Sequence, residues 1–252
     1  MQVVLVQEAA SLDPAENRDR LGSLVPDGAD LVVLPEAFAR DFGEPGSDVA
    51  AYAETPDGPF ATEVARVAQA HRTTVVAGMF ERAEEEGGTP YNTVVVRGAV
   101  HADYRKIHLY DSFGYRESDV IGAGPLTPLT FDLAGTTVGL MTCYDLRFPE
   151  LARRLVDAGA EVIVVPAAWV AGPRKVDHWT TLLRARAIEN TVHVVGVGQP
   201  GPRYTGHSLV VGPLGDVLAE AGEDAACLRV DLDPSAVAEA RRTNPSLANR
   251  RL

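Results

Sequence analysis

Three residues with reactive side chains follow apolar, strand-like stretches of the sequence. Glu36 follows ADLVVLP, Lys106 follows HADYR and Cys143 follows TVGLMT. In sheets that alternate with helices, ligands collect outside the carboxyl ends of the strands, so these side chains are expected to meet there. A thiol attacks a carbonyl as its thiolate and therefore needs a base, for which Glu36 is suited. The ammonium of Lys106 could stabilise the negative oxygen that develops during the attack.

The sequence around Cys143 is typical of a nucleophile placed on a sharp turn. Tyr144, Asp145 and Arg147 follow it, just before a helix is predicted to begin. Such a turn exposes the nucleophile and offers the next backbone N–H, here that of Tyr144, to an oxyanion. The second cysteine, Cys227, lies inside the strand-like ACLRVDLD and is expected to be a buried, inert side chain. The two cysteines have neither disulfide-framework nor zinc spacing, so no metal is expected.

Composition favours a small-molecule partner. The 252 residues contain 23 Lys and Arg against 35 Asp and Glu, a net charge of −12, which disfavours nucleic acid and anionic lipid as partners. No apolar stretch reaches the ~18 residues that span a membrane, and the strand-like VVLV follows Met1 and Gln2 without a basic leader. The sequence therefore predicts a cytoplasmic protein.

The predicted strands and helices repeat in the two halves of the chain. The first half reads QVVLVQ, ADLVVLPEAF, TTVVAGMFE and YNTVVVRGAV, and the second TVGLMTC, GAEVIVVPAAW, TVHVVGVG and GHSLVVGPLGDVL. Two helices are predicted in the first half, one after Pro14 and one from Phe60 onward. Two more are predicted in the second half, one after Pro149 and one around Trp179. Two β-α-β-α-β-β halves, each with helices on one side of its sheet, must bury their bare faces against each other. The expected fold is α/β, a four-layer α-β-β-α sandwich forming a single domain over residues 1–252.

The ordered motifs resemble those of the nitrilase, or carbon–nitrogen hydrolase, superfamily. LPE with Glu36, RKIHLYD with Lys106 and CYDLRFPEL with Cys143 match its three catalytic motifs, and GYRESD resembles the segment that supplies a second glutamate, here Glu117. HWTTLLRARAIEN and GHSLVV are similar to stretches of the omega-amidase and deaminated-glutathione amidase branch. The resemblance covers nearly the whole chain. It implies a catalytic set of Glu36, Lys106, Cys143 and Glu117 that works without a metal or other cofactor.

Carried over to this chain, the resemblance implies covalent hydrolysis of a small linear amide. The Cys143 thiolate would attack the carbonyl, ammonia would depart, and water activated by Glu36 would hydrolyse the thioester. A nitrilase or an N-carbamoyl amino acid amidohydrolase would use the same residues. A protein of another class, which keeps the fold for binding or redox sensing without catalysis, is a further alternative.

The residues expected to bind the substrate flank these motifs. They are Tyr144, Arg147, Trp169, Arg174 and His178. A planar guanidinium suits the bidentate capture of a carboxylate, so Arg147 and Arg174, together with the adjacent Lys175, favour a carboxylate-bearing substrate such as an ω-amide of a dicarboxylic acid.

Two further expectations concern structure and assembly. His108, two residues after Lys106, is expected to have a structural hydrogen-bonding role. The resemblance also implies a homodimer or higher homo-oligomer, paired through the ELARRL helix after the cysteine and the tail NPSLANRRL.

Overall fold

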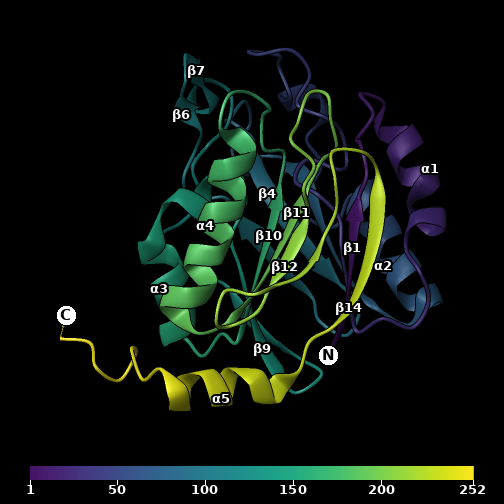
Figure 1. The fold of residues 1–252 in the computed structure, drawn as a ribbon. Coiled ribbons are helices and arrows are strands. Elements are labelled where there is room, and N and C mark those ends of the chain that lie inside the picture. Colours follow the sequence, from purple (N-terminus) through teal and green to yellow (C-terminus); the bar gives the residue numbers. More distant parts are fainter. Residues whose placement is uncertain (252) are drawn as a thin grey trace.

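The structure, a computed structural model, describes residues 1–251 and contains two six-stranded sheets packed face to face (Figure 1). The first sheet has the order β14-β1-β2-β3-β4-β5, with bounds Ala226–Asp231, Gln2–Gln7, Leu31–Val33, Thr74–Glu81, Tyr91–Arg97 and Ala102–Arg105. The second has the order β13-β12-β11-β10-β9-β8, with bounds Val217–Glu220, Leu209–Val211, His193–Gly198, Val162–Ala167, Thr136–Leu140 and Thr130–Leu133.

Helices cover the outer face of each sheet and give four layers. The helices α1 (Pro14–Leu24) and α2 (Pro59–His71) lie on the first sheet, and α3 (Pro149–Asp157) and α4 (Lys175–Asn190) on the second (Figure 1). The helix α5 (Pro234–Thr243) lies apart from both layers and leads into the C-terminal tail. No helix within residues 1–251 combines the length and apolar character needed to cross a membrane.

Several short elements complete the chain. They are the 3₁₀ helices η1 (Ala50–Tyr52), η2 (Glu117–Asp119) and η3 (Cys143–Arg147), and the hairpin of β6 (Asp111–Ser112) and β7 (Tyr115–Arg116).

The internal repeat predicted from the sequence is present. In each half, three successive parallel strands are followed by an antiparallel one: β1, β2, β3 and β4 in the first sheet, and β9, β10, β11 and β12 in the second. The helices lie in equivalent places between these strands. The predicted α-β-β-α sandwich of two β-α-β-α-β-β halves is therefore confirmed.

Alternation along β1 shows why its four central residues, 3–6, are all apolar. Val3 and Leu5 belong to the hydrophobic cluster that spans the two sheets, whereas Val4 and Val6 belong to the cluster under α1 and α2. All four side chains are at most 3% exposed. Since burying one such side chain contributes about 1.5–3 kcal/mol, both faces of the sheet stabilise the fold.

The turn that carries Glu36 begins earlier than the sequence suggested. The run ADLVVLPEAF predicted a strand through Phe38, but β2 ends at Val33. The chain then turns, and Ala37 takes a left-handed φ of 55°. The turn lies directly on β3, because a Cβ on Gly78 would stand 2.3 Å from the backbone nitrogen of Ala37 and 2.7 Å from the Cα of Glu36.

The turn that carries Cys143 is equally tight. The predicted strand TVGLMTC is shorter than expected, since β9 ends at Leu140 and η3 begins at Cys143 itself. Cys143 has a φ of 46°, in the left-handed region that residues other than glycine seldom occupy. The predicted sharp turn at the nucleophile is thus present, as a 3₁₀ turn that precedes α3.

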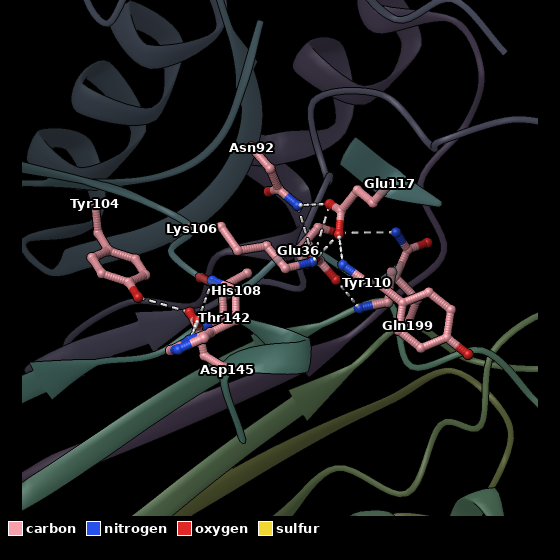
Figure 2. A network of polar contacts seen from close by, with 11 residues as sticks. Glu36, Asn92, Tyr104, Lys106, His108, Tyr110, Glu117, Thr142, Asp145 and Gln199 are labelled. Atoms are coloured by element: carbon pink, nitrogen blue, oxygen red, sulfur yellow. Dashed lines mark hydrogen bonds and ion pairs between the residues drawn. The ribbon is translucent and has the colours of Figure 1, made fainter. Parts of the chain in front are cut away.

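Asp145 joins this turn to the loop after β5. Its buried carboxylate, 0% exposed, accepts hydrogen bonds from the Tyr104 hydroxyl at 2.7 Å and from the backbone nitrogens of Thr142 and His108, both at 2.9 Å (Figure 2). The His108 Nδ1 also lies 2.7 Å from this carboxylate, so His108 has the structural role expected. One aspartate therefore ties the cysteine turn to the segment that follows Lys106.

The expectation that Cys227 is buried is wrong. It is exposed on β14, where partly buried and exposed residues alternate. Because β14 is an edge strand paired only with β1, the outward-facing side chain at position 227 meets solvent.

Replacing Gly78 by alanine is expected to displace the Glu36 turn. The new Cβ would overlap backbone atoms that cannot move independently, so the free energy of unfolding should fall by about 1–3 kcal/mol in urea denaturation. Gly22→Ala in α1 is the matched control, since its Cβ would approach no side chain closer than that of Arg66 at 4.0 Å and alanine favours a helix by up to ~1 kcal/mol. Equal stability of the Gly78→Ala protein and the wild type would contradict the close approach.

Replacing Asp145 by alanine is expected to be severely destabilising. It leaves the buried donors of Tyr104, Thr142 and His108 without their acceptor, each at a cost of about 1–3 kcal/mol. Tyr104→Phe, which removes one of these bonds, should cost only about 1 kcal/mol. Urea denaturation measures the loss of unfolding free energy in each variant. Similar losses in Asp145→Ala and Tyr104→Phe would show that the other donors find new partners.

Candidate active site

The four catalytic candidates line one cavity of about 950 Å³. Glu36 and Lys106 follow the strands β2 and β5 of the first sheet, Cys143 lies in the turn after β9, and Glu117 lies in η2. The structure therefore brings together all four residues that the sequence placed in the catalytic set. A cavity of this size is within the range of small-molecule sites.

Lys106 lies buried between two carboxylates. Its Nζ is 2.9 Å from Glu36 Oε1 and 2.9 Å from Glu117 Oε2, and its side chain is 2% exposed (Figure 2). Burial by itself disfavours the ammonium, but the charges of Glu117 and Glu36 outweigh this effect and raise the pKa of Lys106 well above its ordinary value. Lys106 is therefore a fixed positive charge across the physiological pH range.

Fixed donors orient both carboxylates. The Nδ2 of Asn92 donates to Glu36 Oε1 at 2.7 Å and to Glu117 Oε1 at 3.1 Å (Figure 2). The backbone nitrogen of Ala168 donates to Glu36 Oε2 at 2.7 Å, and that of Tyr110 donates to Glu117 Oε2 at 2.6 Å. Each carboxylate is thus held by the backbone and by Asn92 as well as by the ammonium.

Cys143 is buried beside this ion cluster, with 7% of the residue exposed. Burial is the main cause that raises the pKa of its thiol well above the ordinary value, and the charge of Glu36 and a hydrogen bond to it act in the same direction. Lys106 opposes the shift without cancelling it. The resting residue is therefore a thiol next to a carboxylate that can accept its proton.

The predicted substrate-binding residues separate into two groups. Trp169 lines the cavity. Arg174 is exposed at the start of α4, while Tyr144, Arg147 and His178 are partly buried and are not part of the lining. Arg147 lies 4.9 Å from the ring of Trp169 and 3.4 Å from His178 Nδ1, so these two residues support Trp169 from outside the lining.

Several lining residues were not predicted as binding residues from the sequence. They are Tyr110, Phe113, Tyr115 and Arg203, whereas Lys175, which also lines the cavity, was already a candidate from the sequence. Tyr110 precedes the β6–β7 hairpin, while Phe113 and Tyr115 lie within it, and all three stand close enough to the lysine motif in the sequence to have been noticed there. Asn92 had no sequence signal, because it lies within the uniformly buried strand β4.

Within residues 1–251, no group of three or more His, Cys, Asp and Glu side chains is arranged to hold a metal ion.

Comparison with known proteins places this site in a family context. A model of the carbon–nitrogen hydrolase family matches residues 3–242. The deaminated glutathione amidase of Escherichia coli O157:H7 is 39% identical over 224 residues, which cover 88% of this chain and 84% of that protein. Human omega-amidase NIT2 is 34% identical over 269 residues, which cover 99% and 95% of the two chains.

A solved structure agrees over the entire chain. XC1258 of Xanthomonas campestris, described as a CN-hydrolase superfamily protein with an arsenic adduct in the active site, superposes with a TM-score of 0.90 and 29% identity. The match covers 100% of this chain and 97% of XC1258. Together with the sandwich fold and the cavity lined by Glu36, Lys106 and Cys143, these similarities show that the chain belongs to the carbon–nitrogen hydrolase family of the nitrilase superfamily.

Proposed function

We propose that this enzyme is an amidase that hydrolyses a small linear amide bearing a carboxylate, through a thioester on Cys143 and with release of ammonia. The observation that carries the proposal is the convergence of Cys143, Glu36 and Lys106 in one buried cavity. The names of the two relatives, a deaminated glutathione amidase and an omega-amidase, support an amide as the substrate.

In the first half of the reaction, Cys143 becomes acylated. Glu36 takes the thiol proton as the sulfur attacks the amide carbonyl, because the raised thiol pKa makes a preformed thiolate unfavourable. The oxyanion is stabilised by the Lys106 ammonium and the Tyr144 backbone N–H. The C–N bond then breaks, Glu36 returns the proton to the departing nitrogen, and ammonia leaves a thioester behind.

In the second half, water releases the acid. Glu36 takes a proton from the water as its oxygen adds to the thioester carbonyl, and the same two donors hold the new oxyanion. The C–S bond breaks, and the proton on Glu36 returns to the sulfur. The product is a carboxylic acid and the enzyme regains its neutral thiol.

Glu117 and Asn92 are positioning residues in this scheme. Glu117 holds Lys106 in its charged form, and Asn92 joins Glu117 to Glu36 by one amide group. Since each carboxylate has an oxygen 2.9 Å from the Lys106 Nζ, the two glutamates share the charge of the ammonium.

Nitrile hydrolysis and the hydrolysis of N-carbamoyl amino acids could use the same residues. Ammonia release from a panel of primary amides, nitriles and ureido acids separates these reactions. A non-catalytic or redox-sensing role predicts that no substrate-derived acyl group ever forms on Cys143, which intact-protein mass spectrometry after rapid quenching can test.

We further propose that residues 1–252 act as one cytoplasmic domain that pairs as a homodimer. Both halves contribute to the same cavity, which supports a single functional unit. The proposed pairing surfaces are the helix α3, which carries ELARRL, and the C-terminal tail, which lies outside the sandwich (Figure 1). Light scattering at micromolar concentration tests the dimer.

Cys143→Ala is expected to abolish ammonia release from an amide substrate, because no group remains to form the thioester. The matched variant Cys227→Ala should keep wild-type activity, since this exposed cysteine lies on the edge strand β14. Ammonia assay and mass spectrometry of the acylated protein check the result. Turnover by Cys143→Ala at the wild-type rate would overturn the mechanism.

Glu36→Gln is expected to lower kcat/KM by about 10²–10⁴-fold, because the glutamine cannot take the proton of the thiol. Its amide can still occupy the hydrogen bonds of Ala168 and Lys106 in part, so folding should be retained. Circular dichroism provides the folding control for the ammonia assay. A fall of less than threefold would exclude Glu36 as the base.

The pH profile is expected to lack an alkaline limb below about pH 9. The pKa of Cys143 is raised above its ordinary 9.0 and that of Lys106 above its ordinary 10.5, so each keeps its proton until the pH rises through the folded-state value. Measurement of kcat/KM for a neutral amide, whose binding needs no cation for a carboxylate, from about pH 6 to 10.5 tests this. A decline that begins near neutral pH would contradict the direction of both shifts.

A further inference from the structure

The chain contains only two lysines, and both are buried at the same cavity. Of its 23 Lys and Arg residues, 21 are arginines, whereas Lys106 and Lys175 are the lysines. These two residues are 2% and 7% exposed, and both line the cavity. Lysine is ordinarily a surface residue, so its restriction to this cavity points to a function for the ammonium group.

Lys175 has no acidic partner in the part of the chain that the structure describes. Three cations line the cavity: Lys106 is paired with Glu36 and Glu117, and Arg203 with Asp41 at 3.3 Å. No Asp or Glu oxygen among residues 1–251 lies within 4.0 Å of the Lys175 Nζ. Lys175 is therefore the lining cation whose charge the described structure leaves uncompensated.

The surroundings of Lys175 are aromatic. Its Nζ donates to the Tyr110 hydroxyl at 2.9 Å and lies 4.1 Å from the ring centre of Phe113 and 5.7 Å from that of Trp169. Burial is the main cause that lowers its pKa, and the charge of Arg147 lowers it further. An ammonium has three donors, and the described contacts use one of them, so an anion would supply both charge and acceptors.

Tyr110 connects the surroundings of the two lysines. Its backbone nitrogen donates to Glu117, the partner of Lys106, while its ring points away from that glutamate and carries the hydroxyl that contacts Lys175 (Figure 2). One residue therefore spans from the catalytic ion cluster to the second ammonium. A linear molecule with its amide at Cys143 could extend along this side chain.

We propose that Lys175 binds the carboxylate at the far end of the substrate and so makes the site selective for ω-amides of acids over neutral amides. This inference rests on the proposed amidase function. Among the three cations that the sequence suggested for this role, it selects Lys175. Of the other two, Arg174 is exposed, and Arg147, 4.9 Å from the ring centre of Trp169, is not part of the cavity lining.

The first test observes binding without catalysis. With ¹³C-labelled lysine, the Cys143→Ala protein should give two side-chain signals, and Lys175→Arg identifies one of them by its loss. Titration with glutaramate, the monoamide of glutaric acid, should shift the Lys175 signal and raise its pKa, whereas neutral pentanamide should not. Equal responses to both compounds, or none at Lys175, would overturn the proposal.

The second test measures selectivity. In the wild type, kcat/KM should be higher for glutaramate than for pentanamide, which has the same chain length but no charge. Lys175→Met should lower the glutaramate value by about 10- to 150-fold, mainly through KM, because one charged hydrogen-bonded pair is lost. The pentanamide value should change less than about threefold, and Lys175→Arg should restore part of the glutaramate value.

The outcomes separate the two proposals. If Lys175→Met lowers kcat/KM equally for glutaramate and pentanamide, Lys175 only supports Tyr110. The inference then fails, although the amidase function stands. If the preference for glutaramate is lost in Arg174→Gln and kept in Lys175→Met, the substrate carboxylate binds at Arg174 and the inference also fails. If the wild type releases ammonia from neither amide, the proposed function fails, while the titration still reports whether Lys175 binds an anion.

Discussion

The burial of Lys106 between Glu36 and Glu117 is the interaction on which the rest of the site depends. An isolated ammonium would be very costly in this interior, and the two carboxylates would repel each other without it. Each member of the cluster therefore requires the others, and Asn92 and the backbone of Ala168 and Tyr110 supply the remaining hydrogen bonds. The arrangement gives one permanent positive charge and one carboxylate that can exchange a proton with Cys143.

Two strained turns deliver the reacting groups to this cluster. Ala37 and Cys143 both have left-handed φ angles, and each lies a few residues beyond the end of a parallel strand. The two turns occupy different places in the two halves of the repeat, because the first follows β2, whose counterpart is β10, whereas the second follows β9, the counterpart of β1. Gly78 supports the first by allowing close contact, and Asp145 supports the second by accepting four nearby donors. Packing and buried hydrogen bonds over a large area stabilise conformations that are unfavourable locally.

The sequence predicted the architecture, and it singled out four residues that the structure brings together in one cavity, because both leave strong local signals. Buried strands read as continuous apolar runs, and reactive residues directly after them are easily found, as with Cys143 after TVGLMT. Asn92 could not be found in this way, since it is one more buried position in β4 and acts through contacts with distant residues. The choice between Arg174 and Lys175 depended on the turn into α4. Arg174 has a φ of 61° and is exposed, whereas Lys175 starts the helix and is buried, and a difference of one residue cannot be read from composition or periodicity.

The excess of carboxylates around Lys106 has a consequence for the end of each catalytic cycle. In the proposed reaction, ionisation of the new acid would place a third carboxylate beside Glu36 and Glu117, with one ammonium to balance them. Like charges in a poorly hydrated cavity repel strongly. The charges that surround the reacting carbonyl would therefore favour departure of the product.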